Sequence, residues 1–292
     1  MGKLDGKIIV ITGSTRGLGL AIARACVAEG AKVVVSSRTR EAVEESVATL
    51  RSAGGQASGQ PCDVSDLAQV EALAEHARET WGGFHVWINN AGISPAYGPT
   101  MHVPPEAFVN ATRTNILGTY YGSLVALRDF LPRHSGKLIN LLGRGDRGRP
   151  VPLQNAYASS KAWVRSFTLT MAKEYRDTGV GIFAFNPGMM STDLLTRLEA
   201  VRGYEEQLKV MPTIIRMWAY PPEVPARRVV WLASNATNGK TGLEVHLMGP
   251  VMMLEGAVKE GLRRLLRRPA PEMVVEVEAI PPALPLSSEA GA

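Results

Sequence analysis

Cysteine and aromatic residues are scarce in this chain. Among its 292 residues only two are cysteines, and aromatic residues make up 6%. Cys26 and Cys62 form no CxxC pair and lie apart from clustered histidines, which argues against a structural zinc site and fits a reducing compartment. We therefore expect no bound metal.

Long hydrophobic runs are also missing. No apolar segment approaches the roughly 18 residues that a membrane-spanning helix requires. Residues 1–6 contain no apolar signal segment, and position 6 lacks the Ser or Thr of a myristoylation site. The sequence therefore predicts a cytoplasmic protein that does not associate with membranes.

The charge excess is small. Lys and Arg number 32 against 27 Asp and Glu, a formal net charge of +5, which favours an anionic ligand. Arginines cluster within 144–149 and 263–268, but neither cluster has interleaved aromatic residues or a recognisable nucleic-acid motif. We expect no nucleic-acid partner.

Short β-branched runs alternate with segments of helical periodicity along the chain. This alternation predicts a parallel sheet with helices on both faces and ligands beyond the carboxyl ends of the strands. The expected strands are 8–12, 33–35, 57–62, 86–89, 137–142, 181–185 and 243–247. The fold class is therefore α/β, a single-domain, doubly wound parallel sheet of Rossmann type.

A glycine-rich turn joins the first expected strand to the first helix. Gly13, Gly17 and Gly19 lack side chains that would keep the backbone from a pyrophosphate, and a helix N-terminus offers unpaired NH groups. After the second strand stand Ser36, Ser37 and Arg38 in place of an acidic residue. With Arg16, Arg38 could bind a 2′-phosphate, so NADP is favoured over NAD, although either arginine could simply lie on the surface.

Tyr157 and Lys161 lie four residues apart in an expected helix, 156–171. Their side chains therefore leave the same helix face, where an ammonium can favour the phenolate of a tyrosine and make it a general acid/base at neutral pH. The alternative is a tyrosine and a lysine that share a half-exposed face by chance.

Two segments depart from the alternation. The insertion at 193–221 follows a strand's carboxyl end and predicts a lid over a substrate, with a satellite piece of core as the alternative. Residues 251–292 form an extension to the main domain, 1–250. We expect a short basic helix within 255–268 and an extended or disordered Pro-rich tail after it.

Six ordered motifs resemble those of the short-chain dehydrogenases/reductases, over about residues 4–250. They are Thr12 to Gly19, Cys62-Asp63-Val64, Asn89-Asn90-Ala91-Gly92, Asn115, Tyr157 with Lys161, and Asn186-Pro187-Gly188 with Thr192. The resemblance implies that Tyr157 is the acid/base, that Lys161 lowers its pKa and binds the nicotinamide ribose, and that Asn115 anchors a proton relay.

The same resemblance implies the residues that bind the cofactor. They are Gly13, Thr15, Arg16, Gly17, Leu18, Gly19, Ser37, Arg38, Asp63, Val64, Asn90, Ala91, Gly92, Tyr157, Lys161, Pro187, Gly188 and Thr192. The expected substrate contacts are Leu142, Gly143, Arg144, Met189, Met211 and Trp218. The implied cofactor is NADP (NADPH), and the implied assembly is a homodimer or homotetramer.

One family feature is missing, the serine that polarises the substrate oxygen. No Ser or Thr lies between Asn140 and Tyr157, and Leu142 or Gly143 occupies the expected serine position. Loss of such a donor typically slows catalysis roughly 100- to 1,000-fold. Another donor such as Arg144 could replace the serine, the substrate could need no such donor, or the protein could bind NADP without turnover.

The sequence thus predicts an NADP-dependent oxidoreductase that interconverts a carbonyl and a secondary alcohol of a small-molecule substrate. The alternative is a catalytically impaired or inactive NADP-binding protein with a regulatory or scaffolding role.

Overall fold

A computed structural model describes residues 2–270 and 273–284. Its centre is a seven-stranded sheet in which every neighbouring pair is parallel. In spatial order the strands are β3 (Gln56–Gly59), β2 (Lys32–Val35), β1 (Ile8–Ile11), β4 (Val86–Asn89), β5 (Lys137–Leu141), β6 (Gly181–Asn186) and β8 (Glu244–His246). The strand order reverses between β1 and β4, where sheets of this kind bind ligands.

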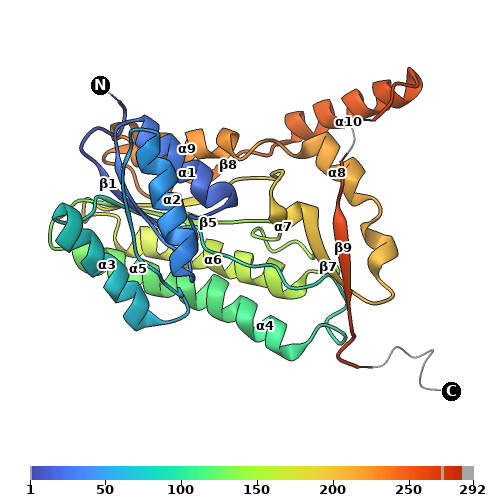
Figure 1. The fold of residues 1–292 in the computed structure, drawn as a ribbon, viewed down its shortest axis with the longest axis horizontal. Coiled ribbons are helices and arrows are strands. Elements are labelled where there is room, and N and C mark those ends of the chain that lie inside the picture. Colours follow the sequence, from blue (N-terminus) through green and yellow to red (C-terminus); the bar gives the residue numbers. More distant parts are fainter. Residues whose placement is uncertain (1, 271–272, 285–292) are drawn as a thin grey trace.

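Helices cover both faces of the sheet (Figure 1). One face carries α1 (Gly17–Ala28), α2 (Arg40–Ser52) and α9 (Glu223–Ala233); the other carries α3 (Leu67–Trp81), α5 (Gly118–Phe130) and α6 (Asn155–Glu174). Alternate residues of β1 enter the two cores, with Ile9 and Ile11 on one side and Ile8 and Val10 on the other. Strand β1 is buried at every position, which explains why it reads as an uninterrupted apolar run. The expected doubly wound α/β fold is confirmed.

The expected lid segment contains its own small strand. After β6 come α7 (Asp193–Thr196), β7 (Arg197–Val201), a short 3-10 turn and α8 (Met211–Trp218). Leu198, Met211 and Ile215 are buried together in a cluster separate from the two main cores. The segment therefore follows a strand's carboxyl end, as a lid would, and also carries a satellite core.

The C-terminal extension folds back onto this segment. Helix α10 (Pro250–Leu265) begins before the expected basic helix, and β9 (Glu276–Ile280) pairs in parallel with β7 from Arg197↔Glu276 to Val201↔Ile280. The described part of the tail is therefore extended, which is one of the two expectations. It pairs with β7 and is not disordered. Residues 271–272 and 285–292 of the expected tail lie outside the described residues.

Strand β7 is held on both edges. Tyr97, in the loop after β4, donates from its N–H to Glu199 O and accepts from Val201 N–H, both at 2.8 Å. On the other edge the Arg202 N–H donates to Ile280 O at 2.8 Å. The tail and the loop after β4 therefore fix the lid strand between them.

We predict that Glu278→Pro loosens the lid while Ala279→Pro does not. Alternate residues of a parallel strand bond to the same neighbour, so the bond at Ile280 places the Glu278 N–H toward β7 and the Ala279 N–H away from it. Proline removes the N–H, and a lost hydrogen bond contributes about 1 kcal/mol. Amide hydrogen exchange in 197–201 should accelerate roughly fivefold in Glu278→Pro only. Equal rates in the two variants would contradict this pairing.

Candidate functional site

The expected catalytic side chains meet at the carboxyl edge of the sheet. Gly92 follows β4 at this edge, and a Cβ placed on it would lie 3.4 Å from Asn115 Oδ1 and 3.5 Å from Lys161 Nζ. Asn115 comes from the helix after β4 and Lys161 from α6, so two different helices direct polar groups at one small residue. Glycine at 92 keeps the space between these groups open.

Tyr157 and Lys161 lie on one face of α6, as their spacing predicts. Lys161 Nζ lies 5.7 Å from the centre of the Tyr157 ring and donates to the backbone carbonyl of Leu141, at the end of β5, at 3.0 Å. The lysine is 5% exposed, so its ammonium is held by the protein and not by water. The pair is therefore anchored to the central sheet.

Burial dominates the electrostatics of the pair. It raises the pKa of Tyr157 above its ordinary range, and Tyr97 and Asp146 raise it further. Burial also lowers the pKa of Lys161 to about 8, although Asp146 opposes this shift. The expected lowering of the Tyr157 pKa is therefore wrong for the chain alone, because burial and the neighbouring Tyr97 and Asp146 all raise it. At neutral pH the Tyr157 hydroxyl carries its proton and can donate it.

Asn115 lies in a π-helical turn, Thr112–Leu117, between α4 (Pro105–Ala111) and α5. Its side chain is fully buried; it accepts from the Ile93 N–H at 2.9 Å and donates to Ile93 O at 2.9 Å and to Ser160 Oγ at 3.0 Å. These bonds tie the turn to the loop after β4 and to α6. Sequence periodicity predicts one continuous helix here and does not reveal the wider turn, which is a frequent feature of functional sites.

The glycine turn is built for close backbone packing. A Cβ on Gly19 would lie 2.2 Å from Gly13 O, so only glycine fits there. Asn90 Nδ2 donates to Thr12 O at 3.0 Å and to Gly13 O at 2.8 Å, which fixes the turn to the end of β4. Gly17 has φ +53°, and the nearest atom to a Cβ there is a methyl of Thr192 at 3.7 Å. Thr192 therefore lies close to the turn, at the start of α1, where helix NH groups can bind a phosphate.

The ends of β2 and β3 lie next to this turn. Ser37 O accepts from the Cys62 N–H at 2.8 Å, and the Asp63 carboxylate accepts from the Ser65 N–H at 2.9 Å. Arg16 and Arg38 are exposed and have no acidic partner among the described residues. Both guanidinium groups are therefore accessible to an anion.

The segment after β6 closes the other side of the site. Asn186 Oδ1 accepts from the Gly188 N–H at 2.9 Å, and the Tyr220 hydroxyl donates to Pro187 O. Gly188 has φ +76°, and a Cβ on it would lie 2.0 Å from the Tyr220 oxygen. Pro187, Gly188 and Thr192 are thereby fixed opposite the glycine turn.

Gly143, and not Leu142, occupies the place of the missing serine. Leu142 is buried with Val164 and Ala184, and its side chain does not point toward the Tyr157 hydroxyl. A Cβ on Gly143 would lie 2.4 Å from Tyr157 Oη and 3.3 Å from Lys161 Cγ. A serine at 143 therefore has no room unless Tyr157 moves.

Asp146 is a component of the site that the sequence did not reveal. It is 7% exposed, and its carboxylate accepts from Asn186 Nδ2 at 2.8 Å, while the same amide donates to Gly143 O at 3.2 Å. The loop beside Tyr157 is therefore clamped to the end of β6. The sequence alone does not distinguish Asp146 from a solvent-exposed residue of an arginine-rich loop. Its hydrogen-bond partner, Asn186, lies forty residues away in the sequence.

Comparisons with known proteins show the family of this chain. A family profile described as "short chain dehydrogenase" matches residues 7–202, about two thirds of the chain. The chain belongs to the short-chain dehydrogenase family. It is an oxidoreductase of that family, as the sequence motifs predict.

Several relatives cover most of this short-chain dehydrogenase. A 3beta-hydroxysteroid dehydrogenase 1 of Eggerthella lenta is 34% identical, over 87% of this chain and 96% of that protein. A probable chlorophyll(ide) b reductase NYC1 of Arabidopsis thaliana is 31% identical, over 88% of this chain and 53% of that protein. A crystal structure of a single-residue variant of actinorhodin polyketide ketoreductase with NADPH is similar with a TM-score of 0.76 and 27% identity, covering 86% of this chain and 99% of that one.

A largely apolar cavity of about 510 Å³ reaches Tyr157 of the dehydrogenase. Its walls come from the loop after β4, the start of α4, the start of α6 and the tail; they include Pro95, Val103, Phe108, Leu153 and Leu284. Of the expected substrate residues, Arg144 is exposed, Met211 is buried in the lid cluster, and Trp218 donates from its indole N–H to Met253 O of α10 at 3.0 Å. Met189 packs against the lid cluster.

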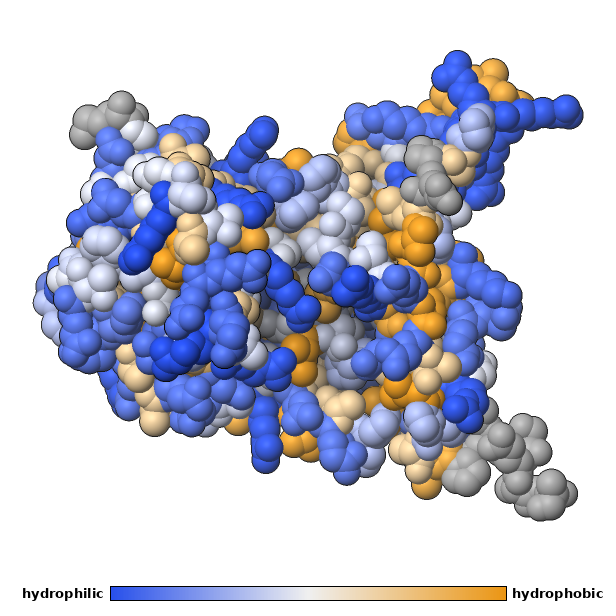
Figure 2. Space-filling view, in the orientation of Figure 1, coloured by the Kyte–Doolittle hydropathy of each residue, from blue (hydrophilic) through white to orange (hydrophobic). Residues whose placement is uncertain are grey.

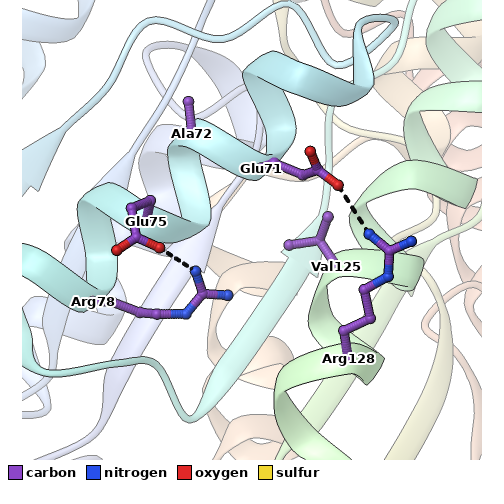
Figure 3. Close-up of a pocket in the computed structure, with 6 residues that line it drawn as sticks. All are labelled: Glu71, Ala72, Glu75, Arg78, Val125 and Arg128. Carbon is purple, nitrogen blue, oxygen red and sulfur yellow. Dashed lines mark hydrogen bonds and ion pairs between the residues drawn. The ribbon is translucent and has the colours of Figure 1, made fainter.

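A second hollow, of about 420 Å³, lies on the outer surface between α3 and α5 (Figure 3). Its side chains pair with one another, Glu75 with Arg78 at 2.6 Å and Glu71 with Arg128 at 2.9 Å. It contains none of the expected site residues. In the described parts of the chain no helix is long and apolar enough to cross a bilayer, and no three potential metal ligands gather at one place.

We predict that Gly143→Ala and Gly143→Ser destabilise the fold, since either side chain must displace the Tyr157 hydroxyl. Overpacking of this kind typically costs about 1–3 kcal/mol of unfolding free energy. Urea unfolding is the measurement. Gly249→Ala is the matched control, because nothing lies within 4 Å of a Cβ there and its φ is −123°. A Gly143→Ser variant as stable as the control would contradict the crowding.

Proposed function

We propose that this protein is an NADPH-dependent reductase that interconverts a carbonyl group and a secondary alcohol on an apolar substrate. The observation that carries the proposal is that Tyr157 lines an apolar cavity and lies beside Lys161, whose ammonium lies with the Asn115 amide next to Gly92. A half-buried, protonated phenol at the carboxyl edge of a parallel sheet is suited to the transfer of a proton to a substrate oxygen.

The position of each residue indicates its role in the reaction. Bound NADPH supplies the hydride, which is chemistry that no side chain provides. Tyr157 donates its proton to the carbonyl oxygen, and Lys161, 5.7 Å from the ring centre, opposes the cost of the buried phenolate that results. Asn115 and Ser160 hold the helix that carries the pair against the loop after β4. In the reverse direction the phenolate accepts the alcohol proton.

The chain's own residues favour NADPH over NADH. Arg16 and Arg38 stand free beside the ends of β2 and β3, and the position after β2 holds Ser36 and Ser37 in place of an acidic residue. An acidic residue there would bind the ribose 2′-hydroxyl of NADH and repel a 2′-phosphate. The NADPH in the ketoreductase structure is consistent with this preference.

The cavity and the relatives indicate where to search for the substrate. An apolar wall of Pro95, Phe108 and Leu153 suits a hydrocarbon ring or chain attached to the reacting carbon. A panel of ketosteroids, hydroxysteroids and polyketide-like ketones covers the chemistry named for the relatives. Consumption of NADPH with any member supports the reductase.

The absence of a serine hydroxyl beside Tyr157 supports a second candidate, an NADP-binding protein with little or no turnover. Gly143 offers no side-chain donor to a developing oxyanion, and such a donor typically accelerates catalysis roughly 100- to 1,000-fold. Burial raises the pKa of Tyr97 and Arg144 opposes that rise, so Arg144 is the charged residue of this loop that we consider as a substitute donor. Tight NADPH binding without oxidation by any member of the panel would favour this candidate.

We predict that Tyr157→Phe lowers kcat about 100- to 10,000-fold and leaves the Kd for NADPH within about threefold, because only the proton donor is removed. NADPH fluorescence gives the Kd and cofactor absorbance gives the rate. Tyr175→Phe, at the far end of α6, is the control and should keep wild-type rates. Full activity in Tyr157→Phe would refute the assigned acid.

We predict that Arg38→Asp raises the Kd for NADPH roughly 10- to 100-fold and changes the Kd for NADH little, since it replaces a charge-assisted bond to phosphate with repulsion. Arg176→Asp makes the same change of net charge in an exposed residue that pairs with Asp177, and should leave both values unchanged. Equal weakening of both cofactors in Arg38→Asp would argue against a 2′-phosphate contact.

A further inference from the structure

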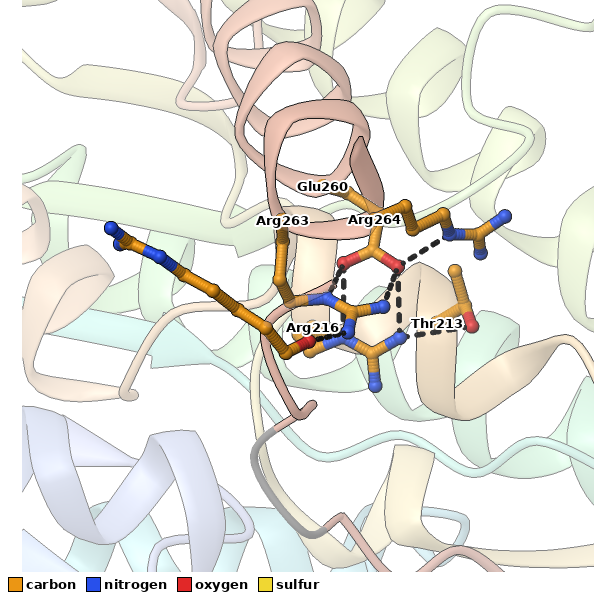
Figure 4. Close-up of polar contacts among 6 residues, drawn as sticks. Thr213, Arg216, Glu260, Arg263 and Arg264 are labelled. Atoms are coloured by element: carbon orange, nitrogen blue, oxygen red, sulfur yellow. Dashed lines mark hydrogen bonds and ion pairs between the residues drawn. The ribbon is translucent and has the colours of Figure 1, made fainter. Parts of the chain in front are cut away.

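Helix α10 attaches to the lid through its polar side. Gly256 packs so closely that a Cβ would lie 2.2 Å from Met217 O of α8, and Glu260 bonds to Arg216 of α8 at 3.1 Å. Arg263 and Arg264 bond to the same carboxylate at 2.8 Å and 2.9 Å (Figure 4). These guanidinium groups hold the pKa of Glu260 well below its usual range. The helix is therefore fixed in rotation by a charged cluster.

The opposite side of α10 is apolar and faces outward. Val251, Leu254, Val258, Leu262 and Leu265 are 72%, 66%, 50%, 51% and 77% exposed. Successive members are three or four residues apart, so they form one stripe along the helix, opposite Gly256 and Glu260. The helix projects from the body in Figure 1, and Figure 2 shows hydrophobic side chains among hydrophilic ones on it. A helix that packs on its own chain through charged residues and exposes an apolar stripe can bind a partner through that stripe.

We propose that this stripe is a homodimerisation surface, on which α10 of a second copy packs antiparallel about a two-fold axis at Val258. The stripe is symmetric about that residue. Antiparallel pairing centred there places Leu254 against Leu262 of the partner copy, Val251 against its Leu265, and Val258 against its own counterpart. A two-fold contact requires such self-complementarity, and the average spacing of 3.5 residues matches a helix–helix seam.

The charges beside the stripe fit the same pairing. Glu255 and Lys259 lie on one flank, and both are exposed. In the antiparallel arrangement Glu255 of one copy lies about 3 Å along the axis from Lys259 of the other, and symmetry makes this ion pair twice. Arg264 lies near one end of the helix, so the two copies of Arg264 stand about 18 Å apart and do not repel strongly.

The helix is short, so the association should be weak and reversible. Its 16 residues span about 24 Å, and a contact of that length is smaller than a typical stable interface. We expect a concentration-dependent dimer through α10, in addition to any contact elsewhere on the protein. Val258→Asp places two like charges on the axis and should remove this association step in sedimentation velocity, while the Tm stays unchanged because the residue is half-exposed.

Cysteine crosslinking of the full-length protein distinguishes this arrangement sharply. Val258→Cys should form a disulfide-linked dimer under copper–phenanthroline oxidation, because the two thiols meet at the axis. Leu254→Cys alone should crosslink at least tenfold less, since its own counterpart is about 12 Å away along the axis, beyond disulfide reach. An equimolar mixture of Leu254→Cys and Leu262→Cys should crosslink well. The native thiols, Cys26 and Cys62, are buried and give no background.

Charge exchange supplies an independent readout. Glu255→Lys and Lys259→Glu should each weaken the dimer, whereas an equimolar mixture of the two single variants should associate as a heterodimer. Two results would overturn the proposal. One is that Leu254→Cys alone crosslinks as well as Val258→Cys does; the other is that Val258→Cys does not crosslink. Binding of monomeric protein to phosphatidylserine/phosphatidylcholine vesicles through α10, with no self-association, would overturn it in favour of a lipid surface.

Discussion

The site depends on one buried ammonium. Lys161 Nζ is held 3.0 Å from Leu141 O at the end of β5, close under the Tyr157 ring and beside Gly92. Burial lowers its pKa to about 8 and raises that of Tyr157, so the protein alone favours neutral forms of both groups. Asp146 opposes the first shift and reinforces the second. The Asp146 carboxylate therefore helps to keep Lys161 charged and Tyr157 protonated. The sequence alone does not single out this residue.

Local patterns account for most of what the sequence predicts correctly. The alternation of apolar runs and helical periodicity specifies the doubly wound sheet, and Gly13 to Gly19 specify the turn at β1, because each depends on neighbouring residues. The four-residue spacing of Tyr157 and Lys161 likewise determines that they share a face. The π-helical turn at Asn115, the clamp between Asp146 and Asn186, and the crowding at Gly143 depend on contacts between distant residues, which a single sequence does not encode visibly.

The insertion and the tail look like two separate departures in the sequence, yet the structure joins them. Strand β9 supplies an edge to β7, and α10 rests on α8 through Glu260 and Arg216. The sequence predicts only a short basic helix within 255–268 and does not indicate how the apolar stripe of α10 is oriented. The charged cluster turns it outward, which no periodicity argument could decide.

The pairing of β7 with β9 also has a consequence for the order of events during synthesis. Nearly eighty residues separate the two strands, so a ribosome releases the lid strand well before its partner. The sheet with its glycine turn is complete by β8, and its emergence precedes that of β9. The nascent protein can thus mature in two stages, first the seven-stranded body and last the small sheet of β7 and β9.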